Sequence, residues 1–199
     1  MSKLFVDEIV HQSSQGSGTI TIGASGETTN IVGTLQNDGA ALISGITMAE
    51  QWRLSTQLAC NTLNADTDVT ANLEKVDTDS PGTIGTGMTE SSGVFTFPST
   101  GIYLILNNYS FNTEAGGSPY HGLITKVTTD NSSYSYATEN YVMISSNYNN
   151  GSSSFIFDVT NTSTHKVQFH VTAITGNTYI AGNTGRNDTF FSFIRLGDT

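Results

Sequence analysis

The chain has little cysteine and little positive charge. Cys60 is the single cysteine in 199 residues, so no disulfide can form within the chain. Lysine and arginine number 7 against 17 aspartates and glutamates, which gives a formal net charge of −10. Nucleic acids and anionic membrane surfaces attract clustered basic residues, so this balance disfavours both as partners. We expect stability to come from packing or from association between copies.

The sequence also has no long apolar run. None approaches the roughly 20 residues that a membrane-spanning helix needs, so we expect no membrane insertion. At the N-terminus, Asp7 and Glu8 interrupt the apolar stretch that a signal peptide would require. If the protein works outside a cell, we expect it to arrive there without a classical secretion signal.

Motifs of enzyme chemistry are missing as well. The four histidines have no metal-ligand spacing, no G-x-S-x-G elbow is present, and no G-K-[ST] follows a glycine-rich loop. Two D-T-D triplets begin at Asp66 and Asp77, but calcium needs about six oxygens or more, and no EF-hand loop accompanies them. We interpret them as solvated turn carboxylates. The sequence therefore predicts no catalytic residue, no metal and no cofactor.

What the chain does contain is typical of β-structure. Only 12% of the residues are charged, against about 25% in an average domain, and Thr, Tyr, Phe, Val and Ile are frequent, with 20 glycines between them. Residues 166–173 alternate apolar and polar side chains, and residues 190–196 form a strongly apolar run. In residues 155–159, Phe155, Phe157 and Val159 alternate with Ile156 and Asp158. Turn residues separate these segments. The pattern predicts an all-β sandwich or jelly roll over residues 52–199.

Two shorter segments precede this head. Residues 1–43 contain glycine-punctuated β runs, which predict a β-rich stem that attaches the protein to its partner. The attachment residues we expect are apolar: Leu4, Phe5, Val6, Ile9 and Val10. Residues 44–55 predict a short neck helix, because Thr47 and Glu50 have the spacing of a capping box. The alternative is that residues 52–54 already belong to the first strand of the head.

One stretch carries a recognisable pattern. Residues 74–105 read EKVDTDSPGTIGTGMTESSGVFTFPSTGIYLI, with the spacing G-x-F-x-x-P-x-x-G-x-Y at Gly93, Phe95, Pro98, Gly101 and Tyr103. This stretch resembles the signature of the C1q/TNF-like jelly-roll family, and DTFFSFIRLG near the C-terminus is similar to that family's closing strand. The resemblance covers roughly residues 52 to 197. It implies a jelly roll that assembles as a homotrimer and serves binding or structure rather than catalysis.

Residues 102–106, IYLIL, are apolar on both faces of the predicted strand. We expect Ile102, Leu104 and Leu106 to pack inside the sandwich and the opposite face to meet a neighbouring subunit. The alternation by itself leaves either parity open. With this choice, the predicted trimer interface consists of Trp52, Tyr103, Ile105, Tyr109, Phe191 and Phe193.

Tyrosine gathers with asparagine and serine between residues 131 and 154. This composition is typical of recognition surfaces, including those for sugars, and is equally compatible with strand residues that pack in the sandwich. The predicted receptor-binding loops contain Tyr134, Tyr136, Tyr141, Tyr148, Asn149 and Asn150.

The N-terminal segment is similar to the stems of bacteriophage fibres and spikes. A stem of this kind combined with a C1q/TNF-like head predicts a trimeric virion-surface protein, a tail or head fibre. We expect it to be assembled in the host cytoplasm and released by lysis. Its N-terminus would dock on other virion proteins, and its head would bind a host glycan or protein. One alternative is a capsid decoration protein. A second is a polysaccharide-degrading spike, which would need a carboxylate pair in a cleft.

Overall fold

The computed structural model describes residues 36–37, 40–41, 45–60, 66–113, 120–143, 148–173 and 178–199. The chain divides into two units, Met1–Ile43 and Ser44–Thr199. In the first unit, β1 (Gln36–Asn37) pairs antiparallel with β2 (Ala40–Ala41). The five predicted attachment residues and most of the predicted stem lie outside the described residues.

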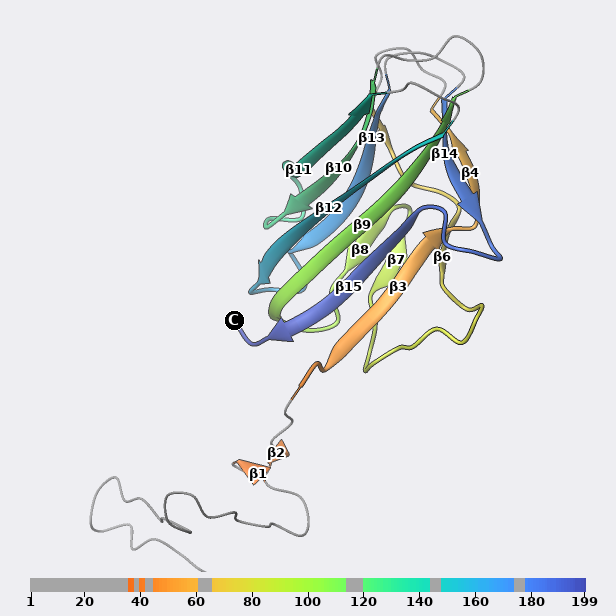
Figure 1. Ribbon diagram of the computed structural model, residues 1–199. Coiled ribbons are helices and arrows are strands. Elements are labelled where there is room, and N and C mark those ends of the chain that lie inside the picture. The colour runs from red at the N-terminus through yellow and green to blue at the C-terminus, as the bar shows by residue number, and fades with distance from the viewer. Residues whose placement is uncertain are drawn as a thin grey trace, which may run out of the picture. The chain divides into compact units, whose positions relative to one another are not determined.

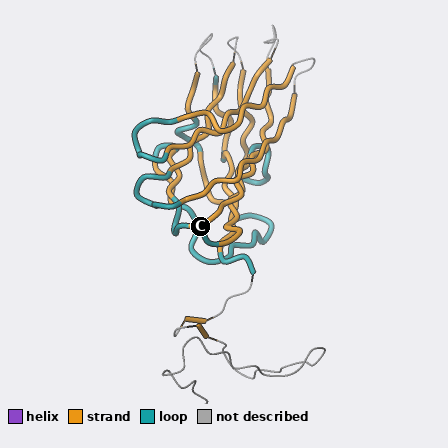
Figure 2. Tube along the Cα trace, turned by 90° about the vertical axis from the view of Figure 1, so that its left-hand side faces the viewer, coloured by secondary structure: helices purple, strands orange, loops and turns teal. Residues whose placement is uncertain are grey.

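The second unit consists of two antiparallel sheets that face each other (Figures 1 and 2). What we call the β9 sheet has the strand order β4-β14-β9-β15-β3-β6, and β12 pairs with the other side of β9 along almost its whole length, from Gly101 to Asn112. Its strands are β3 (Met48–Leu54), β4 (Thr56–Ala59), β6 (Leu73–Lys75), β9 (Gly101–Thr113), β12 (Tyr148–Val159), β14 (Thr178–Asn183) and β15 (Phe190–Gly197).

The opposite layer, the β10 sheet, has the order β11-β10-β13-β8-β7, and β5 pairs with β13. Its strands are β5 (Asp66–Asp68), β7 (Thr89–Ser91), β8 (Val94–Thr96), β10 (Tyr120–Thr128), β11 (Ser135–Met143) and β13 (Lys166–Ala173). Strand neighbours in both sheets are often far apart in the sequence, as in a jelly roll.

The predicted neck helix is wrong, and the described residues contain no helix. Residues 48–54 form β3, which pairs with β15 on one side and β6 on the other. Met48 and Leu54 are buried, and Trp52 packs edge-on against Phe95 with ring centroids 5.4 Å apart. A capping box contributes only about 1 kcal/mol, so two strand pairings and a buried face outweigh it. The alternative, that residues 52–54 belong to the first strand of the head, is confirmed.

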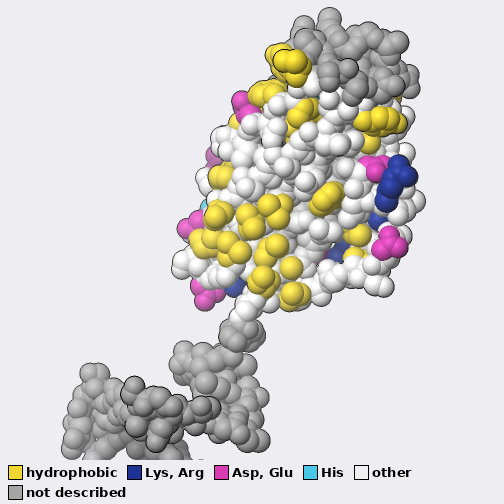
Figure 3. Space-filling view, in the orientation of Figure 1, with side chains coloured by type: hydrophobic (Ala, Val, Ile, Leu, Met, Phe, Trp, Pro, Cys, Tyr) yellow, Lys and Arg dark blue, Asp and Glu magenta, His cyan; other side chains and the backbone are white. Residues whose placement is uncertain are grey.

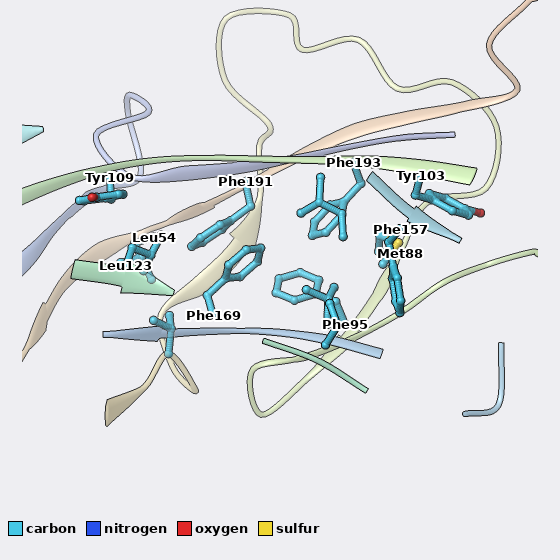
Figure 4. Close-up of a cluster of buried hydrophobic side chains, with 14 of the residues drawn as sticks. Leu54, Met88, Phe95, Tyr103, Tyr109, Leu123, Phe157, Phe169, Phe191 and Phe193 are labelled. Carbon is cyan, nitrogen blue, oxygen red and sulfur yellow. The ribbon is translucent and has the colours of Figure 1, made fainter. Parts of the chain in front are cut away.

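The core between the sheets is rich in aromatic rings (Figure 4). Phe169 of the β10 sheet stacks on Phe191 of the β9 sheet, with centroids 3.9 Å apart and an interplanar angle of 18°. Phe95 contacts both, and Phe193 lies 5.0 Å from Phe95. Residues from β8, β13 and β15 thus hold the two layers together.

The strand parity expected for β9 is reversed in the structure. Tyr103, Tyr109, Phe191 and Phe193 point into the sandwich and are at most 1% exposed within a single chain (Figure 4). Ile105 belongs to the same core and is fully buried. Side chains that are covered within one chain offer no surface to a second copy. The predicted trimer interface is therefore wrong for these five residues, and Trp52 is a half-buried neighbour of the core.

The tyrosine hydroxyls explain how this parity is tolerated. Tyr103 donates to the carbonyl of Ser99 at 3.0 Å, and Tyr109 donates to the carbonyl of Asn140 at 2.8 Å. Each ring fills the core while its polar end reaches a backbone acceptor. Burial raises the pKa of Tyr109 to about 12, so the hydroxyl stays a donor at neutral pH.

Candidate functional site

The outer face of the β9 sheet carries a row of apolar side chains. Ile156 of β12 is opposite Leu104 of β9, which is opposite Ile194 of β15. Ile194 is opposite Ala49 of β3, and Ala49 forms a bridge with Ile84. We call these five residues the apolar row. It crosses the strands at one level and faces away from the core.

The row widens into a patch. Ile102 and Leu106 flank Leu104 on the same face of β9, where the expected parity would have turned them inward. At the two ends of the row, Ile156 is 60% exposed and Ile84 is 46% exposed. Figure 3 shows hydrophobic side chains gathered over this part of the sheet. A contiguous exposed apolar patch of this kind marks an interaction surface more often than chance.

An ionic cluster around a buried arginine holds the segment that carries Ile84. Arg53 is fully buried, and its guanidinium bonds Glu74 at 2.7 Å, Asp77 at 2.8 Å and the Thr78 hydroxyl at 2.7 Å. Partial burial opposes charge on Glu74, but hydrogen bonds from Arg53 and Thr184 outweigh it and lower the pKa of that carboxyl.

Glu50 anchors the same segment from the core side. Its carboxylate accepts from the Trp52 indole at 2.9 Å and from the Met88 backbone at 2.5 Å, and it pairs with Lys75 at 2.7 Å. Both ends of the segment that carries Ile84 are thereby tied to β3.

One carboxylate of each D-T-D triplet pairs with a basic side chain, so these residues are more than the solvated turn carboxylates that the sequence predicted. Asp77 binds Arg53, as described above. Asp68 accepts from Lys126 at 2.9 Å and from His170 Nδ1 at 2.7 Å on the outer face of the β10 sheet. Within the described residues, no group of three or more His, Cys, Asp or Glu side chains is placed to hold a metal.

The six predicted receptor-binding residues lie on two faces. Tyr136 and Tyr141 stand on β11 and are exposed on the outer side of the β10 sheet, and Tyr134 lies in the turn before β11 with Lys126 over its ring. Tyr148 and Asn150 are exposed on the outer side of the β9 sheet. Most of these residues are therefore in strands, as the alternative interpretation held, but they do not pack in the core.

Asn149 is the exception among the six. It is half-buried on the side of β12 that faces the sandwich. The tyrosine cluster of the sequence is therefore not one site, because β11 pairs in the β10 sheet and β12 pairs in the β9 sheet.

A polar hollow of about 500 Å³ opens on the outer face of the β9 sheet. Two of the predicted residues, Tyr148 and Asn150, line it. The other main lining residues were not predicted from the sequence: Asn108, Ser110, Arg186, Asn187, Asp188 and Phe190. They come from β9, from the loop after β14 and from β15, and no local pattern connects these segments. Ile156 of the apolar row, by contrast, could have been found from the sequence, because it alternates with Phe155 and Phe157.

Comparison with protein-family models finds no match, and comparison with curated proteins finds none either. None of the described residues forms a helix long and apolar enough to cross a membrane.

Solved structures do match. Murine APRIL at pH 8.5 superposes with a TM-score of 0.55 at 13% identity, over 75% of this chain and 98% of that chain. APRIL at pH 5.0 gives 0.55 at 15% identity, over the same shares. Eiger TNF from S. frugiperda gives 0.54 at 14% identity, over 76% of this chain and 94% of that chain. Identity this low shows the fold alone. The chain is an all-β protein with a TNF-like jelly-roll sandwich, as the motif at residues 93–103 predicted.

Proposed function

We propose that this protein is a non-enzymatic, homotrimeric surface protein of a bacteriophage virion, a short fibre or spike whose jelly-roll head binds the host surface. The apolar row on the outer face of the β9 sheet is the observation that carries the proposal. It offers the head a surface for self-association. Tyr103 and Ile105, predicted for this role, cannot provide one because they face the core.

The geometry of the row suits a closed ring. A ring with threefold symmetry needs a heterologous contact, in which one end of a surface meets a different end on the next copy. The row has two different ends, Ile156 on the edge strand β12 and Ile84 beyond β3. Both ends are exposed in the single chain, so each has apolar area left to bury. TNF-like domains are typically trimeric, which supports self-association.

The virion assignment draws on the sequence. The chain is acidic, contains one cysteine, and has a glycine-punctuated N-terminal segment similar to phage stems. In this proposal, the apolar residues from Leu4 to Val10 dock on other virion proteins. The exposed tyrosines of the head supply rigid aromatic area for contact with a host surface component.

The test is to locate the protein in purified virions of the phage that encodes it, by cryo-electron microscopy of the intact particle. We expect trimeric density at a tail or head fibre, with the jelly-roll heads outward. Purified trimer should also bind host cells and compete with adsorption. Density spread over the capsid shell, together with no cell binding and a loss of capsid stability when the protein is removed, would identify a decoration protein instead.

A further inference from the structure

The polar hollow on the β9 sheet has the chemistry of a ligand site. It lies on the same face as the apolar row, further along the strands, where Asn108 and Ser110 follow Leu106 on β9. We propose that this hollow binds a neutral saccharide. The inference rests on the proposed function, since it names the ligand class through which the head would hold a host surface.

The floor of the hollow offers mixed hydrogen-bonding groups. Ser110 of β9 is directly opposite Asn150 of β12 in the strand register, and Asn108 is one row away on the same face. An asparagine amide provides two donors and an acceptor site, and a serine hydroxyl is both donor and acceptor. Sugar hydroxyls also donate and accept, so a polyhydroxylated ring matches this floor better than a ligand that only accepts.

The rim of the hollow is charged but balanced. Arg186 Nε donates to Asp188 Oδ1 at 2.7 Å, and the two side chains are 71% and 22% exposed. These are the charged residues among those that line the hollow, and together they sum to zero. A phosphate or carboxylate ligand would meet the Asp188 carboxylate as well as the guanidinium, in a chain whose formal net charge is −10. The balance therefore favours a neutral ligand.

Aromatic surface is available beside the polar groups. Tyr148 of β12 is 63% exposed and lines the hollow, and Phe190 of β15 is half-buried opposite Asn108. The C–H face of a pyranose ring is apolar, and it gains contact area against an aromatic ring. Polar floor, neutral rim and aromatic side together provide both parts of saccharide recognition.

The volume of the polar hollow, and its comparison with two other hollows, also favour it as the saccharide site. About 500 Å³ falls within the roughly 300–1,000 Å³ of typical ligand pockets. A second hollow of about 560 Å³ on the β10 sheet is lined by Tyr120, Tyr141, Val142 and Met143, which provide no amide or charged side chain. A third, lined in part by Gln51 and Asp79, is smaller at about 260 Å³.

The experiment uses the full chain in its assembled form, because a neighbouring copy on the same face would lie near the hollow. An array of immobilised neutral and anionic oligosaccharides is probed with the protein, and titration calorimetry with a bound neutral oligosaccharide measures affinity. We expect Tyr148→Ala and Asn150→Ala each to weaken binding roughly fivefold to tenfold, the cost of one lost contact. The control is Met143→Ala, an exposed side chain on β11 of the other sheet, 79% exposed. It should stay within about twofold.

Three results would overturn the inference: no neutral saccharide bound at millimolar concentration, binding of anionic glycans alone, or a loss caused by Met143→Ala and not by Tyr148→Ala. Light scattering on the same samples separates this inference from the proposed function. A trimer that binds host cells but no neutral saccharide overturns only the inference. A monomer that binds no cells overturns the proposed function.

Discussion

Replacing Ile156 with serine tests the self-association surface most directly. Ile156 stands at the open end of the apolar row, opposite Leu104, and is 60% exposed in a single chain. Full burial of an isoleucine side chain is worth about 1.5–3 kcal/mol. The 60% still exposed therefore represents about 1–2 kcal/mol per copy, or about 3–5 kcal/mol in a trimer. The fold itself should change little, because the side chain contributes little to the core.

That free energy corresponds to a loss of roughly a hundredfold to several-thousandfold in the trimer association constant. The concentration at half-dissociation of a trimer varies as the square root of its dissociation constant. Sedimentation velocity over a dilution series should therefore show the midpoint raised by roughly tenfold to sixtyfold for Ile156→Ser.

The control variant is Met143→Ser. Met143 is 79% exposed, but it stands on β11 of the other sheet, so its replacement should leave the midpoint unchanged. The reasoning is refuted if the unmodified protein is monomeric at every concentration, or if Met143→Ser dissociates the oligomer as strongly as Ile156→Ser does.

Three further predictions concern the fold. Burial lowers the pKa of His121 from 6.5 to about 4, so between these pH values the unfolded chain binds a proton that the folded chain does not. The free energy of unfolding, measured with urea, should therefore fall by about 2–3 kcal/mol between pH 6.5 and pH 4. His121→Gln should remove this contribution to the pH dependence. Gly151→Ala should destabilise by about 1–3 kcal/mol, since a Cβ there would overlap the Tyr109 hydroxyl; an unchanged melting temperature would contradict this packing. Phe191→Ala, which removes the ring stacked on Phe169, should cost about 3–5 kcal/mol in chemical denaturation, and a cost below about 1 kcal/mol would mean that the core collapses around the gap.

The sequence by itself determined the class of fold. Period-two alternation in residues 166–173 and 155–159 requires extended strands with one buried face. The spacing of Gly93, Phe95, Pro98, Gly101 and Tyr103 narrowed this class to a TNF-like jelly roll. Both signals are local, because they depend on side-chain direction within one strand and on the turns that bound it.

The β3 segment marks the limit of local signals. A capping-box spacing at Thr47 and Glu50 favours a helix over residues 44–55 in isolation. Pairing with β15 and β6, and burial of Glu50 beneath Lys75 and the Met88 backbone, decide for a strand instead. The competing contacts range from Leu73, 19 positions after its partner Leu54, to Arg195, 147 positions after its partner Met48, and no local pattern contains them.

Only the tertiary structure decided which face of β9 is inside. Alternation in IYLIL separates Tyr103 and Ile105 from Ile102 and Leu104, but both sets are apolar, so either could face the core. The ring of Phe97, which packs against Tyr103, and the Ser99 carbonyl that accepts the Tyr103 hydroxyl settle the choice. The polar hollow depended on the fold in the same way, because β9, β12 and the loop before β15 meet only through the pairing of β12 and β15 with β9. An apolar row and a saccharide-type hollow on one outer face are thus products of strand order, which the sequence encodes only through long-range packing.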